Sequence, residues 1–272
     1  MHGIGNDYIF FDCMDGEPEN LGELSKRLSD RHFSIGGDGV IALCKSDIAD
    51  CKMRMFNADG SEGKMCGNGI RCLGKLAHDL GYAKGNTCTV ETISGIKELE
   101  FTLSDDGLVS SVKVNMGRAE LDGKKIPSTF SGEKVISQPL KVGGKTYEVT
   151  LVSMGNPHCV IFIDPCESDV EGVGKQIEFH PAFPERVNVE FINVINENHL
   201  KMRVWERGSG ETLACGTGAC AAVVASCLNG YSNKGEEVTV SLLGGDLKIT
   251  YTDEAVYMTG GAQLAFTGEI EV

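Results

Sequence analysis

The chain has 272 residues, of which 41% are hydrophobic and 24% charged, which is the usage of an ordinary globular protein with room for two domains. A net charge of −14 argues against nucleic-acid binding, which favours a basic surface. The N-terminus lacks a basic segment followed by an apolar run, and the longest apolar stretch, residues 214–228, is short and broken by glycine. We therefore expect neither export nor membrane insertion, and a cytoplasmic location.

Three segments have the hydrophobic patterns of helices. Residues 21–31 and 70–80 place their apolar side chains on one side of a helix, which predicts two amphipathic helices. Almost every residue from 219 to 228 is small or apolar, and a helix that is hydrophobic all round belongs in a core.

Most of the remaining chain is typical of strands. β-rich composition, much of it alternating, predicts strands at 187–192, 200–205, 238–242 and 247–251, with Gly244-Gly245 as the turn between the last two. We expect an α+β fold of two pseudo-symmetric domains, each a mixed or barrel-like sheet around one central buried helix. The polar segment 127–144 follows Asn115-Met116-Gly117, and we place the domain change near there. The N-terminal domain is then 1–117, completed by a C-terminal strand at 261–272, and the C-terminal domain is 118–260.

Two cysteines occupy equivalent positions in the two halves of the chain. Cys66 and Cys215 are each followed by Gly-x-Gly and then by a predicted helix. A glycine turn that leads into a helix leaves backbone N–H groups free to bind an anion, and the helix dipole favours a thiolate at that position. Two such turns facing one another would bind a carboxylate between two thiols. That layout suits the removal of a proton from one face of a carbon and its return to the other.

The other cysteines carry no comparable signal. Eleven cysteines without an export signal suggest free thiols in a reducing compartment. The spacings 66/72 and 215/220 are not the C-x₂-C pairs of zinc sites, so no metal is expected. Small core residues are expected at eight positions, namely Cys13, Cys44, Cys51, Cys72, Cys88, Cys166, Cys220 and Cys227.

A dinucleotide-like pattern occurs at Gly216-Thr217-Gly218-Ala219-Cys220-Ala221, which matches G-x-G-x-x-A. That pattern carries weight only directly after a buried strand. Here the polar segment Arg207-Gly208-Ser209-Gly210-Glu211 precedes it, so nicotinamide binding is rejected.

Six motifs, in order and over nearly the whole chain, resemble those of the diaminopimelate epimerase family. They are Met1-His2-Gly3-Ile4-Gly5-Asn6-Asp7, Phe56-Asn57-Ala58-Asp59-Gly60-Ser61, Met65-Cys66-Gly67-Asn68-Gly69, Ser153-Met154-Gly155-Asn156-Pro157-His158, Pro184-Glu185-Arg186-Val187-Asn188 and the run from Glu206-Arg207-Gly208 to Cys215-Gly216-Thr217-Gly218. The resemblance implies a homodimeric, pyridoxal-free epimerase that needs no cofactor. It would interconvert LL- and meso-diaminopimelate for lysine and peptidoglycan synthesis.

The resemblance also implies a role for each site residue. Cys66 and Cys215 correspond to the two catalytic bases, one a thiolate and the other a thiol. The reacting end of the substrate would be held by Asn6 and by the N–H groups of Gly67-Asn68 and Gly216-Thr217. The family's distal amino-acid site would be formed by Asn57, Asn156, Asn188, Glu206 and Arg207, with Arg207 on the carboxylate and Glu206 on the ammonium. His158 and Glu206 resemble residues that tune the thiol pKa values.

Two departures and two alternatives accompany this interpretation. Gly39 stands where some family members have a glutamine, and Phe266 where some have a tyrosine tied to dimerisation. Racemases of proline, hydroxyproline or histidine share the paired-cysteine plan, but they would not require the full set of distal-site residues. Outside enzymes, two facing thiols could serve a redox sensor or a thiol-dependent binding module.

Overall fold

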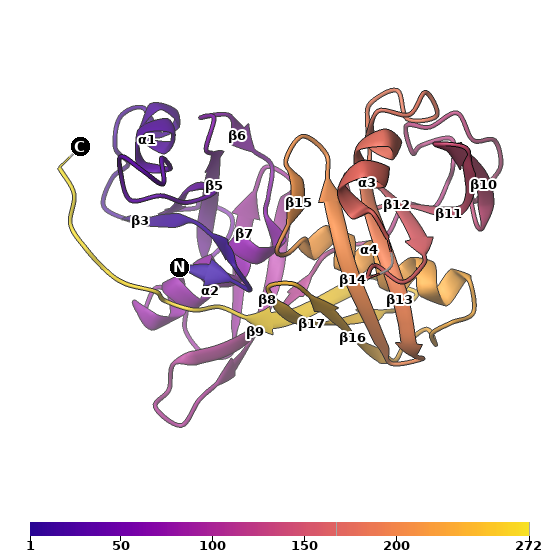
Figure 1. The fold of residues 1–272 in the computed structure, drawn as a ribbon. Coiled ribbons are helices and arrows are strands. Elements are labelled where there is room, and N and C mark those ends of the chain that lie inside the picture. Colours follow the sequence, from indigo (N-terminus) through magenta and orange to yellow (C-terminus); the bar gives the residue numbers. More distant parts are fainter. Residues whose placement is uncertain (167, 272) are drawn as a thin grey trace. The chain divides into compact units, whose positions relative to one another are not determined.

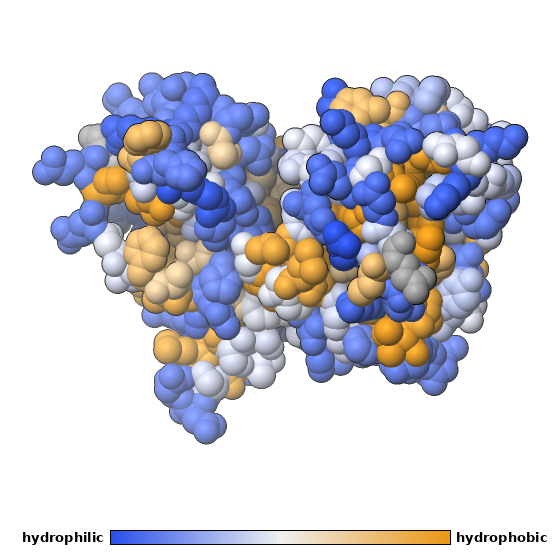
Figure 2. All heavy atoms as spheres, in the orientation of Figure 1, coloured by the Kyte–Doolittle hydropathy of each residue, from blue (hydrophilic) through white to orange (hydrophobic). Residues whose placement is uncertain are grey.

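The computed structural model describes residues 1–166 and 168–271, and it confirms an α+β fold. The chain forms two compact units (Figure 1). The N-terminal unit consists of Met1–Asn115 with Thr259–Val272, and the C-terminal unit of Met116–Met258. Hydrophilic residues cover much of the face drawn in Figure 2, as the charged fraction of the sequence predicts. No helix in the described ranges is long and apolar enough to cross a membrane.

The N-terminal unit is a mixed sheet with two helices. Its elements are β1 (His2–Gly3), β2 (Asn6–Asp7), β3 (Ile9–Cys13), α1 (Leu21–Leu28), β4 (Gly39–Cys44), β5 (Cys51–Asn57), β6 (Glu62–Gly63), α2 (Gly67–Asp79), β7 (Thr87–Thr92), β8 (Gly95–Leu103) and β9 (Val109–Asn115). The strand order is β9-β8-β7-β5-β4-β3, with β6 paired to β5 and a separate β1-β2 ribbon. The pairs β3/β4 and β5/β7 are parallel.

Helix α2 is the central helix of this unit. It packs against β4, β5, β7, β8 and β9, while α1 packs on β4 and β5. Strand β4 is buried at all six positions, so its apolar sequence does not alternate. Helix α2 begins at Gly67, earlier than the predicted residue 70, and α1 ends at Leu28, earlier than the predicted residue 31.

The C-terminal unit repeats this plan. Its elements are β10 (Gln138–Val142), β11 (Lys145–Ser153), β12 (Pro157–Phe162), α3 (Val170–Glu178), β13 (Asn188–Asn196), β14 (His199–Glu206), β15 (Gly210–Thr212), α4 (Gly216–Leu228), β16 (Glu237–Leu242) and β17 (Gly245–Tyr251). The strand order is β10-β11-β12-β13-β14-β16-β17, with β15 paired to β14. Helix α4 packs against six of these strands and is buried along most of its length, as its uniformly apolar sequence predicts. The four predicted strands correspond to β13, β14, β16 and β17.

The C-terminal residues differ from the prediction. The last strand, β18, is Val256–Gly261 and contains the boundary between the two units. Beyond it, the described residues of the expected strand 261–272 form only a bridge in which Gln263 and His2 exchange two backbone hydrogen bonds. Leu264 and Phe266 are 53% and 67% exposed, so their side chains do not anchor a strand against the sheet.

Two further expectations are changed by packing. The polar segment 127–144 lies inside the C-terminal unit, where part of it forms β10 and pairs with β11. Cys166 is exposed, so it is not the core residue that we predicted. Cys227 is half-buried, and the other six cysteines expected in the core are buried.

Candidate active site

Cys66 and Cys215 are the N-cap residues of α2 and α4. Cys66 has φ −124° and ψ 122°, and its Sγ accepts a hydrogen bond from the Gly69 N–H at 3.3 Å. Cys215 has φ −124° and ψ 107°, and its Sγ accepts from the Gly218 N–H at 3.4 Å. Both caps use the side-chain geometry of a serine or threonine N-cap, with sulfur in place of oxygen. Each unit therefore has one thiol at the positive end of a thirteen-residue helix.

The second glycine of each Gly-x-Gly leaves little room for a side chain. A Cβ on Gly69 would lie 2.4 Å from Ile41 Cδ1. A Cβ on Gly218 would lie 2.9 Å from Glu190 Oε1 and 3.2 Å from Cys215 Sγ. The Gly-x-Gly sequence thus lets each helix start against a buried strand, and it keeps the sulfur close to the first turn.

In the N-terminal unit, Asn6 contacts the candidate thiol. Its Oδ1 lies 3.3 Å from Cys66 Sγ, and its Nδ2 donates to Asp38 Oδ2 at 2.6 Å. Asn68 is buried and its Oδ1 accepts from Arg71 at 3.0 Å, so its side chain faces Arg71. Asn57 is the last residue of β5, and its Nδ2 donates to Ser61 Oγ at 3.0 Å.

In the C-terminal unit, a chain of hydrogen bonds starts at Cys215. Its Sγ lies 3.6 Å from Thr217 Oγ1, which accepts from Asn156 Nδ2 at 3.3 Å. Asn156 Oδ1 lies 3.1 Å from His158 Nε2, and His158 Nδ1 lies 2.7 Å from Glu190 Oε1. Thr217 is on α4, Asn156 directly precedes β12, His158 is on β12 and Glu190 is on β13, so the packing of the unit links four side chains to the thiol.

The predicted distal-site residues of this unit gather where β14 ends. Asn188 is buried, donates to Pro157 O at 3.0 Å and accepts from the Arg207 N–H at 2.9 Å. Arg207 is exposed, and its NH1 donates to Glu185 O at 2.9 Å. Glu206 Oε1 accepts from Thr212 Oγ1 at 2.5 Å. Asn188 thus fixes the backbone that carries Arg207.

Burial changes the chemistry expected of Cys215. The pKa of its thiol is raised well above the usual value, first by burial and then by the carboxylates of Glu206 and Glu190, while Thr217 and the Gly218 N–H oppose the rise. The helix dipole led us to expect the opposite direction. That expectation was wrong because the sequence shows the helix start but not the depth of burial around the sulfur.

Glu190 and Asp38 are polar residues of the site that our sequence analysis did not select. Glu190 and His158 are both fully buried, and Glu190 Oε2 has no hydrogen-bond partner within the described part of the chain. Burial raises the pKa of Glu190, while His158 opposes the rise. A signal for Glu190 was present, since it is a charged residue inside an apolar strand. Asp38 had a weaker signal, as an acid in the turn Gly36-Gly37-Asp38-Gly39.

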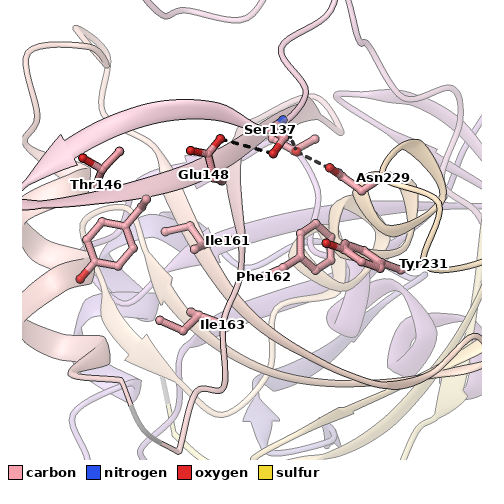
Figure 3. Close-up of a pocket in the computed structure, with 10 residues that line it drawn as sticks. Ser137, Thr146, Glu148, Ile161, Phe162, Ile163, Asn229 and Tyr231 are labelled. Atoms are coloured by element: carbon pink, nitrogen blue, oxygen red, sulfur yellow. Dashed lines mark hydrogen bonds between the residues drawn. The ribbon is translucent and has the colours of Figure 1, made fainter.

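A cavity of about 290 Å³ in the C-terminal unit is separate from these residues. It is shown in Figure 3, where the rings of Phe162 and Tyr231 lie side by side with centroids 4.7 Å apart. None of the predicted site residues lines it. Within the described ranges, no group of three or more His, Cys, Asp or Glu residues could hold a metal ion.

Comparisons with known proteins show the family to which this chain belongs. The family model of diaminopimelate epimerase matches residues 1–121 and 150–265. The chain belongs to the diaminopimelate epimerase family. A diaminopimelate epimerase from Acetivibrio thermocellus is 50% identical over 100% of this chain and 97% of its own length. One from Methanococcus maripaludis is 50% identical over 100% of this chain and 98% of its own length.

Solved structures show that the family's fold is shared more widely. A PhzF-family phenazine biosynthesis protein from Bacillus anthracis has a TM-score of 0.67 at 16% identity, covering 96% of this chain and 92% of its own. A probable proline racemase from Agrobacterium radiobacter has a TM-score of 0.66 at 14% identity, covering 98% and 92%. At these identities the likeness concerns the fold, and the choice of substrate must come from the site residues.

Proposed function

We propose that this protein interconverts LL- and meso-2,6-diaminopimelate by proton transfer at Cα, with Cys66 and Cys215 as the two bases. The observation that carries the proposal is the 50% identity to curated diaminopimelate epimerases over the whole chain. The thiol at the N-cap of α2 and the thiol at the N-cap of α4 support the choice of the two bases. One thiolate removes the Cα proton and the other thiol returns a proton to the opposite face, so the two exchange roles with the direction of reaction.

The helix N-termini supply the electrostatic part of the mechanism. The Cα–H of an amino acid is a very weak acid, so the negative charge that develops on the carboxylate must be stabilised. We assign that role to the N–H groups of Gly67-Asn68 and Gly216-Thr217, at the positive ends of α2 and α4. The substrate ammonium adds a positive charge beside the thiols and lowers their pKa. His158 and Glu206 also adjust the pKa values of the two thiols. The proposed reaction requires no cofactor.

Specificity is assigned to residues near the end of β14 in the C-terminal unit and to Asn57 at the end of β5 in the N-terminal unit. Arg207 would bind the distal carboxylate and Glu206 the distal ammonium, with amides from Asn57, Asn156 and Asn188. The bond from Asn188 Oδ1 to the Arg207 N–H supports this assignment, because it fixes the position from which the guanidinium extends. Lysine lacks the distal carboxylate, so we expect it to be a very poor substrate.

We further propose that the enzyme works in the cytoplasm as a homodimer. This proposal rests on the family resemblance, from which the chain departs at Phe266, where some relatives have a tyrosine tied to dimerisation. Sedimentation equilibrium of the purified chain tests it: a mass of one chain at micromolar concentration would reject the dimer.

Deuterium exchange tests the reaction itself. LL-diaminopimelate incubated with the enzyme in heavy water should gain deuterium at Cα and give the meso isomer, as mass spectrometry and chiral chromatography measure. Cys66→Ala and Cys215→Ala should each abolish epimerisation while the circular dichroism spectrum is unchanged. Wild-type turnover in either variant would remove that cysteine from the mechanism, and efficient racemisation of lysine or proline would reject the substrate.

A further inference from the structure

Cys66 faces an amide whose orientation is fixed from behind. Asn6 is on β2, and its Oδ1 lies 3.3 Å from Cys66 Sγ. Its Nδ2 points the other way and donates to Asp38 Oδ2 at 2.6 Å. An amide can be turned end for end at little cost unless its neighbours distinguish oxygen from nitrogen. The identity of the group behind Asn6 therefore decides which end faces the sulfur.

Asp38 makes that distinction because, among the described residues, all three groups that hydrogen-bond to its carboxylate are N–H donors. In addition to Asn6 Nδ2, Oδ2 accepts from the Asp7 N–H at 3.2 Å, and Oδ1 accepts from Arg31 NH2 at 3.0 Å. Burial and the neighbouring Asp7 raise the pKa of Asp38, whereas Asn6, the Asp7 N–H and Arg31 oppose the rise. A carboxylate is a pure acceptor, so it fixes the Asn6 nitrogen toward itself and the Asn6 oxygen toward Cys66.

We propose that Asp38 is a positioning residue that acts through Asn6 to hold Cys66 in its protonated form. The sulfur accepts from the Gly69 N–H and, as a thiol, donates S–H to Asn6 Oδ1. A thiolate would instead meet the lone pairs of that oxygen, which disfavours the charged form. This inference rests on the proposed role of Cys66 as one of the two bases. It adds a residue that favours the thiol form of Cys66, which is the form that returns a proton to Cα.

Asp7 provides a matched control for charge. Like Asp38, it is an anion paired with Arg31, through bonds of 2.6 and 3.0 Å, but its side chain bonds to Arg31 and not to Asn6. In the described part of the chain, Cys72, Arg71 and the amino group of Met1 are titratable groups that also face this part of α2. None of the three is substituted in either variant, although Asp7→Asn also removes a charge that raises the pKa of the Met1 amino group.

The experiment uses the full chain carrying Cys215→Ala and measures how fast iodoacetamide alkylates Cys66 at each pH. Mass spectrometry quantifies the Cys66 peptide, and the midpoint of the rate against pH reports the ionisation of the Cys66 thiol. In Asp38→Asn the single amide oxygen stays on the charged Arg31 guanidinium, which is a stronger donor than a backbone N–H, and the amide nitrogen takes the place of Oδ2. The Asp7 N–H then loses its acceptor, and the Asn6 amide reverses and presents N–H to the sulfur. We expect the midpoint pH to fall by about one unit, which is about tenfold faster alkylation below the midpoint. Asp7→Asn should shift the midpoint by about 0.3 unit or less.

A double variant separates action through Asn6 from action through space. Asn6→Ala should lower the midpoint without any change at Asp38, and adding Asp38→Asn should then shift it no further. Equal shifts in Asp38→Asn and Asp7→Asn would overturn the proposal, as would an Asp38→Asn shift that persists without Asn6. An unchanged or raised midpoint in Asn6→Ala overturns it even where Asp38→Asn fails to fold. None of these measurements uses substrate, so deuterium exchange by the wild type decides the proposed function separately.

Discussion

Replacing His158 by leucine should leave a buried carboxylate without a partner. His158 and Glu190 are both fully buried, and Glu190 Oε1 lies 2.7 Å from His158 Nδ1 while Oε2 has no hydrogen-bond partner among the described residues. Removal of the imidazole therefore takes away the one charge-assisted bond that Glu190 makes through Oε1. Removal of one partner of a buried ion pair lowers the free energy of unfolding by about 3–5 kcal/mol, because the other group stays buried without a partner.

The cost should depend on pH with a definite sign. Burial already raises the pKa of Glu190 above the ordinary value of 4.5, and His158 opposes that rise, so in His158→Leu the folded pKa of Glu190 rises further and favours the neutral acid. The folded state then binds more protons than the unfolded state. The contribution of Glu190 to the free energy of unfolding of the variant is therefore fully present below pH 4.5. It falls by about 1.4 kcal/mol per pH unit as the pH rises toward the folded pKa of Glu190.

Urea denaturation followed by circular dichroism between pH 4 and 8 measures both effects. The double variant His158→Leu with Glu190→Leu is the matched control, because it removes the whole pair, and we expect it to be more stable than His158→Leu at pH 7. The reasoning is refuted if His158→Leu unfolds at the wild-type urea concentration at pH 7 with no steeper loss of stability toward high pH.

Three further predictions follow from the site and the surface. Arg207→Lys should reduce kcat/KM for diaminopimelate by about tenfold or more, because lysine keeps the charge but loses the bidentate contact with the distal carboxylate. An unchanged kcat/KM in steady-state assays would contradict the role of Arg207. If both thiols reach one Cα, an oxidant should inactivate the enzyme by forming a disulfide between Cys66 and Cys215, and bound substrate should slow the inactivation. Peptide mass spectrometry that finds both thiols still alkylatable in the inactive protein would contradict this prediction. In the native protein, iodoacetamide should label exposed Cys166 faster than fully buried Cys159, with unfolding in urea abolishing the difference, and equal native rates would contradict the packing.

The local features of this protein could be predicted from its amino-acid sequence. Helix α4 could be predicted because a segment that is apolar on every side has no stable place outside a core. The two cysteine caps could be predicted because Cys-Gly-x-Gly before a helix is a short-range pattern, and the N–H groups it leaves free belong to the same turn. The hairpin of β16 and β17 could be predicted from the glycine pair, although its two-residue turn is Leu243-Gly244 and Gly245, expected in the turn, is the first residue of β17.

The tertiary structure alone decided what surrounds those features. The direction of the pKa of Cys215 depends on Glu190 and Glu206, which reach α4 from β13 and β14, and on burial that neighbouring elements provide. The orientation of Asn6 depends on Asp38, which lies 32 positions away in the chain. A pattern of hydrophobic and polar residues records which face of an element is buried. It does not record which polar atoms from distant strands meet there, because those partners are fixed by strand order and register, and burial and hydrogen bonding then set the charge of each group.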